Sequence, residues 1–253
     1  MKLLQCILVE NPCYKRGAKM KPEGIVLHST GANNPTLKRY VQPSKNQYQL
    51  MGEVLPSPKT YDRYKMLELL GTNNYANDWN RVTNPAVCVH AFVGELFNGE
   101  IASVQTLPWG MKCWGCGSGA KGSYNNTHIQ IEMCEDGLGD GGHLDKVWKE
   151  AAELCAHLCK ANKLSPSAIR SHAEAYRDGY GTNHGDPEHW FRIYGRTMDQ
   201  FRAYVAKLMD IPDYAKMVKE RFGFADATID YLRQYKYADD LLKKLATGGK
   251  DET

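Results

Sequence analysis

Turn-forming residues recur between positions 179 and 187, and this segment constrains most strongly how the chain can fold. A long helix is excluded there by the spacing of Gly179, Gly181, Asn183, Gly185 and Pro187. The surrounding residues 171–190 carry three imidazoles, namely His172, His184 and His189. Because loops on a rigid scaffold often hold functional groups, we expect this segment to contribute to a site.

A fourth imidazole, His28, stands at the end of the apolar strand predicted for residues 25–28. Together with His172 and Asp186 it offers two nitrogens and one oxygen, a set that leaves one zinc position open for water. Glu132 is a candidate proton acceptor and His184 a candidate oxyanion donor. The alternative is structural: His28 is a half-buried histidine, and Asp186 and Pro187 form a turn.

Residues 127–133 alternate between polar and apolar types, which predicts a strand. One face of this strand carries Ile129, Ile131 and Met133, and the other carries His128, Gln130 and Glu132. A sheet with one polar face suits a site built upon it.

Other segments show equally regular patterns. We expect strands at residues 7–9, 87–93 and 101–105, the last two joined by a hairpin at Asn98 and Gly99. Helices are expected at 36–41, near 64–70, at 144–160 and after a capping box at Thr197. These elements predict an α/β fold, with a central mixed sheet flanked by helices.

The chain divides into a main domain at residues 1–210 and a small helical segment at 211–246. Residues 43–85 are predicted to be an irregular insertion, and 247–253 a disordered tail. The C-terminal segment is expected to form two short helices, 214–222 and 226–245. It could dock on the main domain, join two copies of the chain, or bind a cell-wall or protein partner.

Composition excludes several classes of function. The 253 residues have a net charge of +3 and no basic stripe, which argues against nucleic-acid binding. No apolar run approaches the roughly 20 residues of a membrane span, and the first ten residues do not read as a signal peptide. The eight cysteines show no regular framework, so we expect reduced, buried thiols. Cys113 and Cys116 have the spacing of half a zinc ribbon, without a second pair to complete it.

Four segments in the same order resemble zinc-dependent N-acetylmuramoyl-L-alanine amidases of the type 2 family, which also includes peptidoglycan recognition proteins. They are residues 25–31 (IVLHSTG), 89–92 (VHAF) with the hairpin turn, 126–132 (NTHIQIE), and His172 followed by Asp186 and Pro187. Residues 28–35 (HSTGANNP) and 183–191 (NHGDPEHWF) resemble endolysins of clostridial phages and prophages.

The resemblance implies a set of site residues. Zinc would be held by His28, His172 and Asp186, and the acidic catalytic residue would be Glu132. His184 takes the place of a basic residue that is often lysine in relatives. Because the segment before Asp186 is longer than in many relatives, His184 or His189 could replace it as third ligand. The candidates for lining the substrate groove are Trp114, Asn126 and Trp79.

The implied reaction is hydrolysis, by zinc-activated water, of the amide between N-acetylmuramic acid and L-alanine in peptidoglycan. The role expected is that of a phage-type endolysin, held in the host cytoplasm until release onto the wall. One alternative is a peptidoglycan-binding module without activity, which zinc content would distinguish. Another is a cysteine peptidase, but no cysteine stands in a nucleophile context. A homo-oligomer formed through the C-terminal helices is a further expectation.

Overall fold

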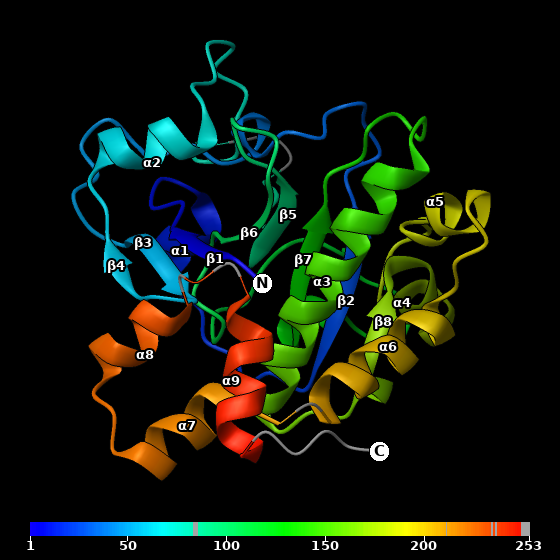
Figure 1. Cartoon of the computed structure of the whole chain (residues 1–253). Helices are drawn as coiled ribbons and strands as arrows, with labels where there is room; N and C mark the ends of the chain where they lie inside the picture. The colour runs from blue at the N-terminus through cyan, green and yellow to red at the C-terminus, as the bar shows by residue number, and fades with distance from the viewer. Residues whose placement is uncertain (83–85, 211, 234, 236, 249–253) are drawn as a thin grey trace. The chain divides into compact units, whose positions relative to one another are not determined.

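The structure is a computed structural model, and it describes the chain except residues 83–85, 211, 234, 236 and 249–253 (Figure 1). Its described part contains one eight-stranded sheet in the order β4-β3-β1-β6-β5-β7-β2-β8. The strands are β1 (Leu3–Cys6), β2 (Gly24–Ser29), β3 (Met51–Leu55), β4 (Lys59–Thr60), β5 (Ala91–Glu95), β6 (Ile101–Gln105), β7 (His128–Met133) and β8 (Ile169–Ser171). Parallel pairs (β1–β6, β5–β7, β2–β7, β2–β8) and antiparallel pairs (β1–β3, β3–β4, β5–β6) both occur. The predicted mixed sheet flanked by helices is confirmed.

Helix α3 (Gly141–Asn162) covers one face of this sheet (Figure 1). The Ser103 hydroxyl of β6 donates a hydrogen bond to Glu150 of α3 at 2.9 Å. Strand register aligns Ser103 with Val93 and Val93 with Met133, so these side chains share the α3 face. By alternation, Gln130 and Glu132 of β7 lie on the opposite face, as their pattern predicts.

The opposite face carries both an apolar cluster and the polar residues of β7. Phe92 belongs to this cluster and is aligned with Glu132 on the neighbouring strand. Helix α2 (Arg63–Leu70) and the 3-10 helix η1 (Leu37–Arg39) supply further members of the cluster, namely Leu37, Met66 and Leu70. Apolar burial thus occupies one part of this face and leaves the polar residues of β7 for a site.

Residues 43–85, expected to be irregular, contain β3, β4 and α2. Strand β3 extends the sheet because Gln5 and Cys6 of β1 pair with Gly52 and Met51. That pairing joins segments about 46 residues apart, so local pattern did not reveal it. The predicted helix near 64–70 is present as α2; residues 83–85 lie outside the described part.

Several predicted boundaries were wrong. The first strand is β1, not 7–9, because residues 3–5 pair in parallel register with 103–105. The helix expected at 36–41 is only the short η1, because the Pro35 carbonyl accepts from the Glu95 N–H and holds the chain extended. The strand expected at 87–93 begins at Ala91 and runs to Glu95.

Other predictions are confirmed. Strand β6 has the expected bounds, and Gly99 turns the hairpin with a φ of 81°. The capping box before α6 (Met198–Asp210) is present: the Thr197 hydroxyl accepts from the Gln200 N–H, and the Gln200 side chain accepts from the Thr197 N–H. The remaining short helices of this region are α1 (Pro12–Arg16), η2 (Tyr124–Asn126), η3 (Pro166–Ala168), α4 (His172–Asp178) and α5 (Glu188–Ile193).

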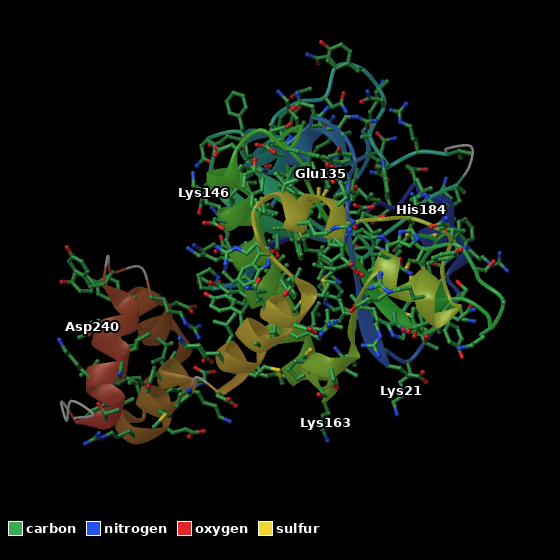
Figure 2. The ribbon with its side chains drawn as sticks, turned by 90° about the vertical axis from the view of Figure 1, so that its right-hand side faces the viewer. Lys21, Glu135, Lys146, Lys163, His184 and Asp240 are labelled. Carbon is green, nitrogen blue, oxygen red and sulfur yellow. The ribbon has the colours of Figure 1, made fainter. Side chains whose placement is uncertain are left out.

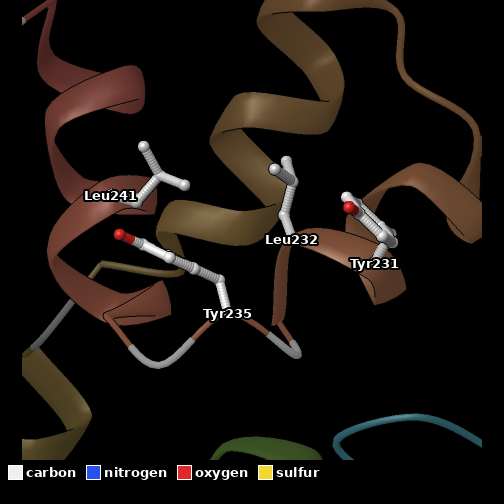
Figure 3. A pocket seen from close by; sticks show the side chains of 4 residues that line it. All are labelled: Tyr231, Leu232, Tyr235 and Leu241. Atoms are coloured by element: carbon white, nitrogen blue, oxygen red, sulfur yellow. The ribbon is translucent and has the colours of Figure 1, made fainter.

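The chain forms two compact units, Met1–Leu208 and Met209–Thr253. The second contains α7 (Tyr214–Phe222), α8 (Asp226–Arg233) and α9 (Ala238–Thr247) rather than the two helices expected. Its small core comprises Ala215, Val218, Ile229, Leu242 and Ala246. A pocket of about 380 Å³ in this unit is lined by Tyr231, Leu232, Tyr235 and Leu241. Figure 3 shows these four side chains. Ile211 of the expected linker and residues 249–253 of the expected tail lie outside the described residues.

All eight cysteines are buried and none forms a disulfide. Cys155 and Cys159 lie in the core on α3, as their spacing indicates. Among the helices that the structure describes, none is long and apolar enough to cross a bilayer.

Candidate functional site

Three neighbouring parallel strands bring the predicted site residues to one edge of the sheet. His28 lies near the end of β2 and is aligned with Glu132 of β7. Strand β8, on the other side of β2, ends at Ser171, and His172 begins α4 immediately after it. In open α/β sheets, sites form beyond the carboxyl ends of such strands.

Local sequence explains why His172 leaves its strand there. Ser171 caps α4 by accepting from the Glu174 N–H, and the Glu174 side chain accepts from the Ser171 N–H. This capping box starts a helix directly at His172 and orients its first turn. The Glu174 carboxylate is held in turn by Arg202 of α6 at 2.9 Å.

His28, His172 and Asp186 converge. The Nδ1 atoms of the two histidines lie 3.1 Å apart, and each faces the Asp186 carboxylate, at 3.1 Å from His28 and 3.3 Å from His172. The His28 side chain is 1% exposed, that of His172 5% and that of Asp186 14%. Within the described residues, these three form a group whose ligand atoms all lie within 4.8 Å of one another.

The other ring nitrogen of each histidine has its own partner. Nε2 of His28 lies 2.7 Å from Oε1 of Gln130, and Nε2 of His172 lies 3.2 Å from the Thr182 hydroxyl. When Nε2 carries the proton for such a bond, Nδ1 keeps the lone pair that a metal needs. The donor set therefore fits a metal ion at the point that the two Nδ1 atoms and Asp186 share.

Asp186 is held as a carboxylate. Burial raises its pKa, but the interactions of the carboxylate with the His172 and His28 side chains outweigh burial and bring the pKa well below its usual range. An ionised oxygen ligand is the form that binds a metal.

Glu132 lies on the same face of the sheet as His28. Its pKa is shifted in the opposite direction from that of Asp186. Its Oε2 atom is buried and has no hydrogen-bond partner. Burial, followed by the negative charges of Asp186 and Glu135, raises the pKa of Glu132 well above its ordinary value. A carboxyl group with an unsatisfied buried oxygen, on the strand next to His28, is suited to exchange a proton.

Neither of the two alternative third ligands, His184 and His189, belongs to this group of three. His184 is exposed (Figure 2). Its ring stacks on His172 at 4.6 Å, and its Nδ1 lies 3.1 Å from the Thr182 hydroxyl. His189 instead pairs with Glu135, a buried carboxylate, with 3.1 Å between Nε2 and Oε1. The structure thus brings Asp186, and neither of these histidines, to the two Nδ1 atoms.

The proposed groove residues are more scattered. Trp79 packs edge-on against Phe92 in the apolar cluster. Trp114 packs against buried Cys88, Cys113 and their neighbours, with Arg16 over its ring. Asn126 is exposed at the end of η2, whereas the adjacent Asn125 bonds to Gln130. A substrate role for Trp79, Trp114 and Asn126 stays a prediction.

Sequence reasoning did not single out Asn125 or Thr182, and it noted Gln130 only as part of a polar face. Polar residues in loops are common, and only the tertiary contacts distinguish these. Of the remaining histidines, His90 is fully buried with both ring nitrogens bonded, and His128 packs against Tyr124 at 3.9 Å.

The chain resembles several solved structures. Among solved structures, the catalytic domain of XlyA has a TM-score of 0.50 at 17% identity, covering 81% of this chain and 99% of that one. The Staphylococcus aureus hydrolase AmiA, in complex with its ligand, has a TM-score of 0.49 at 20% identity, covering 79% of this chain and 78% of that one. A mutant endolysin from Bacillus subtilis has a TM-score of 0.47 at 19% identity, covering 80% and 96% respectively.

At these identities the XlyA match shows a shared fold alone. A search of curated protein sequences found no match. The model of the family described as N-acetylmuramoyl-L-alanine amidase, however, matches residues 18–189, a range that contains His28, Glu132, His172 and Asp186. Because this match spans well over half of the chain, the protein belongs to the N-acetylmuramoyl-L-alanine amidase family.

Proposed function

We propose that this protein is a zinc-dependent amidase that hydrolyses the bond between N-acetylmuramic acid and L-alanine in peptidoglycan. The observation that carries the proposal is the convergence of two Nδ1 atoms and one carboxylate at 3.1–3.3 Å. Two imidazoles with one carboxylate form a common catalytic zinc set, with a position left for water or substrate.

The donor types support zinc over other common cations. Magnesium and calcium prefer oxygen ligands, whereas two of the three donors here are imidazole nitrogens. The hydrogen bonds that the two histidines donate through Nε2 to Gln130 and Thr182 also provide the outer support that zinc-binding histidines usually have.

When bound, zinc supplies Lewis acidity toward water and toward a carbonyl oxygen. The protein supplies the proton transfers. Glu132, with its unpartnered buried Oε2, accepts a proton from the attacking water and returns it to the leaving nitrogen. His184, exposed beside His172, donates a hydrogen bond to the oxygen on which negative charge develops.

We further propose that the enzyme acts as an endolysin, because residues 28–35 and 183–191 resemble those of clostridial phage lysins. We assign a wall-contacting role to the C-terminal unit. Its cavity of about 380 Å³ exposes Tyr231 and Tyr235, whose rings offer apolar faces with a polar tip, suited to the faces of sugars.

The decisive test combines elemental analysis for zinc with clearing of purified cell walls. We expect about one zinc per wild-type chain, with both zinc and clearing lost in Asp186→Ala. Asp210→Ala is the matched control, because Asp210 is exposed at the end of α6. Zinc retained by Asp186→Ala would assign the third ligand to His184 or His189. A wild type with neither zinc nor clearing would contradict the amidase and favour a non-catalytic binding module.

A further inference from the structure

The Cys113–Cys116 motif has no role in the reaction described above, yet it contacts the supports of both proposed zinc histidines. Cys116 is fully buried, and its sulfur lies 3.4 Å from the Gln130 amide nitrogen. Its backbone carbonyl accepts from the Thr182 N–H at 2.9 Å and lies 3.1 Å from the Thr182 hydroxyl. Gln130 and Thr182 are the partners of His28 and His172.

The orientation of the Gln130 amide follows from Asn125. The Asn125 Oδ1 atom faces the backbone N–H groups of Gly115 and Cys116, both at 3.0 Å, so it must be the amide oxygen. The Gln130 atom 2.8 Å from that oxygen must then be its NH₂ nitrogen. The Gln130 oxygen is therefore the atom that faces His28, and His28 carries its proton on Nε2.

The tautomer of His172 follows from the hydrogen bonds of Thr182. The Thr182 hydroxyl donates to the Cys116 carbonyl, because a carbonyl only accepts. The lone pairs of that hydroxyl are then available to the His172 Nε2–H. In its neutral form, each histidine therefore turns an unprotonated Nδ1 toward Asp186. Both tautomer assignments trace back to the backbone of residues 115 and 116.

The backbone of this motif lies close against the Gln130 side chain at Gly115. A Cβ atom added at Gly115 would collide with Oε1 of Gln130 and would crowd Val89. Glycine therefore allows the loop to approach the amide side chain that orients His28.

We propose that residues 113–116 form a platform that sets the ring tautomers of both zinc ligands, with Gln130, Asn125 and Thr182 as positioning residues. The cysteine pair would then serve to present backbone groups rather than to bind metal. This inference rests on the proposed zinc site.

The test measures zinc affinity by competition with a chelator, and the visible spectrum of the Co²⁺-substituted protein. We expect Thr182→Val and Gln130→Met to bind zinc about 10- to 100-fold more weakly and to alter the Co²⁺ bands, as loss of an outer hydrogen bond usually does. Thr182→Ser keeps the hydroxyl and should bind like the wild type. Thr72→Val, at an exposed threonine after α2, is the matched control.

A double-mutant cycle tests the connection through Asn125. Because Asn125 acts through Gln130, Asn125→Ala with Gln130→Met should weaken zinc binding no further than Gln130→Met alone. Thr182→Val acts on the other histidine, so its effect should add to that of Gln130→Met.

The outcomes separate the two proposals. A wild type that binds no zinc would overturn the proposed function. A wild type that binds zinc, with Thr182→Val and Gln130→Met binding as tightly and giving the same Co²⁺ spectrum, would overturn the platform alone. Thr182 is exposed, so its replacement remains informative even if Gln130→Met does not fold.

Discussion

At the scale of single residues, the proposed mechanism assigns proton transfer to Glu132 and metal binding to other side chains. It shares a sheet face with His28 but is not among the three converging ligands. Glu132→Gln keeps the size of the side chain and removes the proton acceptor. We expect clearing of cell walls to slow by about 100- to 10,000-fold, the range for loss of general acid–base catalysis, with zinc content unchanged.

The measurement is the initial clearing rate at matched zinc loading. Glu53→Gln is a suitable control, because Glu53 bonds to Tyr61 in the sheet region formed by β3 and β4. A Glu132→Gln enzyme that cleared walls at the wild-type rate would remove this residue from the mechanism.

The site residues differ in how readily the sequence alone identifies them. His28, His172 and Asp186 combine rare residue types with recognisable neighbours, and the fold brings them together. Gln130, Asn125 and Thr182 belong to common polar types, and their importance depends on hydrogen bonds across 5 to 102 residues of chain. No local pattern contains that information.

At the scale of elements, a buried histidine stands immediately before β5. We expect it to make the free energy of unfolding depend on pH. His90 is fully buried; its Nε2 bonds to the Met111 carbonyl, and its Nδ1 accepts from the Gln130 N–H. Burial lowers the pKa of His90 to about 4, although the bond to Met111 opposes this. Protonation would place a second N–H against the Gln130 N–H.

The consequence for stability has a definite sign. An unfolded histidine has a pKa near 6.5, so below that pH the unfolded chain binds a proton that folded His90 refuses. The free energy of unfolding should therefore fall as pH drops from about 6.5 toward about 4, with no contribution from His90 above about 6.5. At pH 5 the loss should be about 2 kcal/mol.

Urea unfolding at pH 7 and pH 5, in the presence of chelator, measures this effect. His90→Gln should lose about 2 kcal/mol less than the wild type between the two pH values. The other histidines are common to both proteins and cancel in the comparison. Equal losses in the two proteins would show that His90 does not set the acid sensitivity.

At the scale of the whole molecule, two units with separate cores allow wall contact and catalysis to be tested independently. The C-terminal unit exposes Tyr231 by 76% and Tyr235 by 54% beside its cavity. Replacing both with alanine should weaken binding to insoluble walls about tenfold, which corresponds to about 1.4 kcal/mol, while zinc content stays the same.

Co-sedimentation with purified walls gives the affinity, and Tyr64→Ala, an exposed tyrosine on α2, is the control. Sedimentation velocity on the same variants tests the other expectation for this unit. Unchanged wall binding, together with a change from dimer to monomer, would assign the tyrosines to self-association.

Sequence alone determined the features that depend on neighbouring residues. The period of α3, the turn at Gly99 and the capping box at Thr197 are local, because their hydrogen bonds and buried faces lie within a few positions of chain. The ligand-type residues were also evident, since histidine and carboxylate chemistry does not depend on the fold.

Tertiary structure decided what depends on distant partners. The position of β1 and the addition of β3 to the sheet follow from backbone pairing between remote segments. The convergence of Asp186, rather than His189, on the two Nδ1 atoms follows from where each side chain finds its partner: Asp186 faces two imidazoles, whereas His189 pairs with buried Glu135. These arrangements arise from burial and hydrogen bonding in the folded chain. The spacing of residues along the sequence does not encode them.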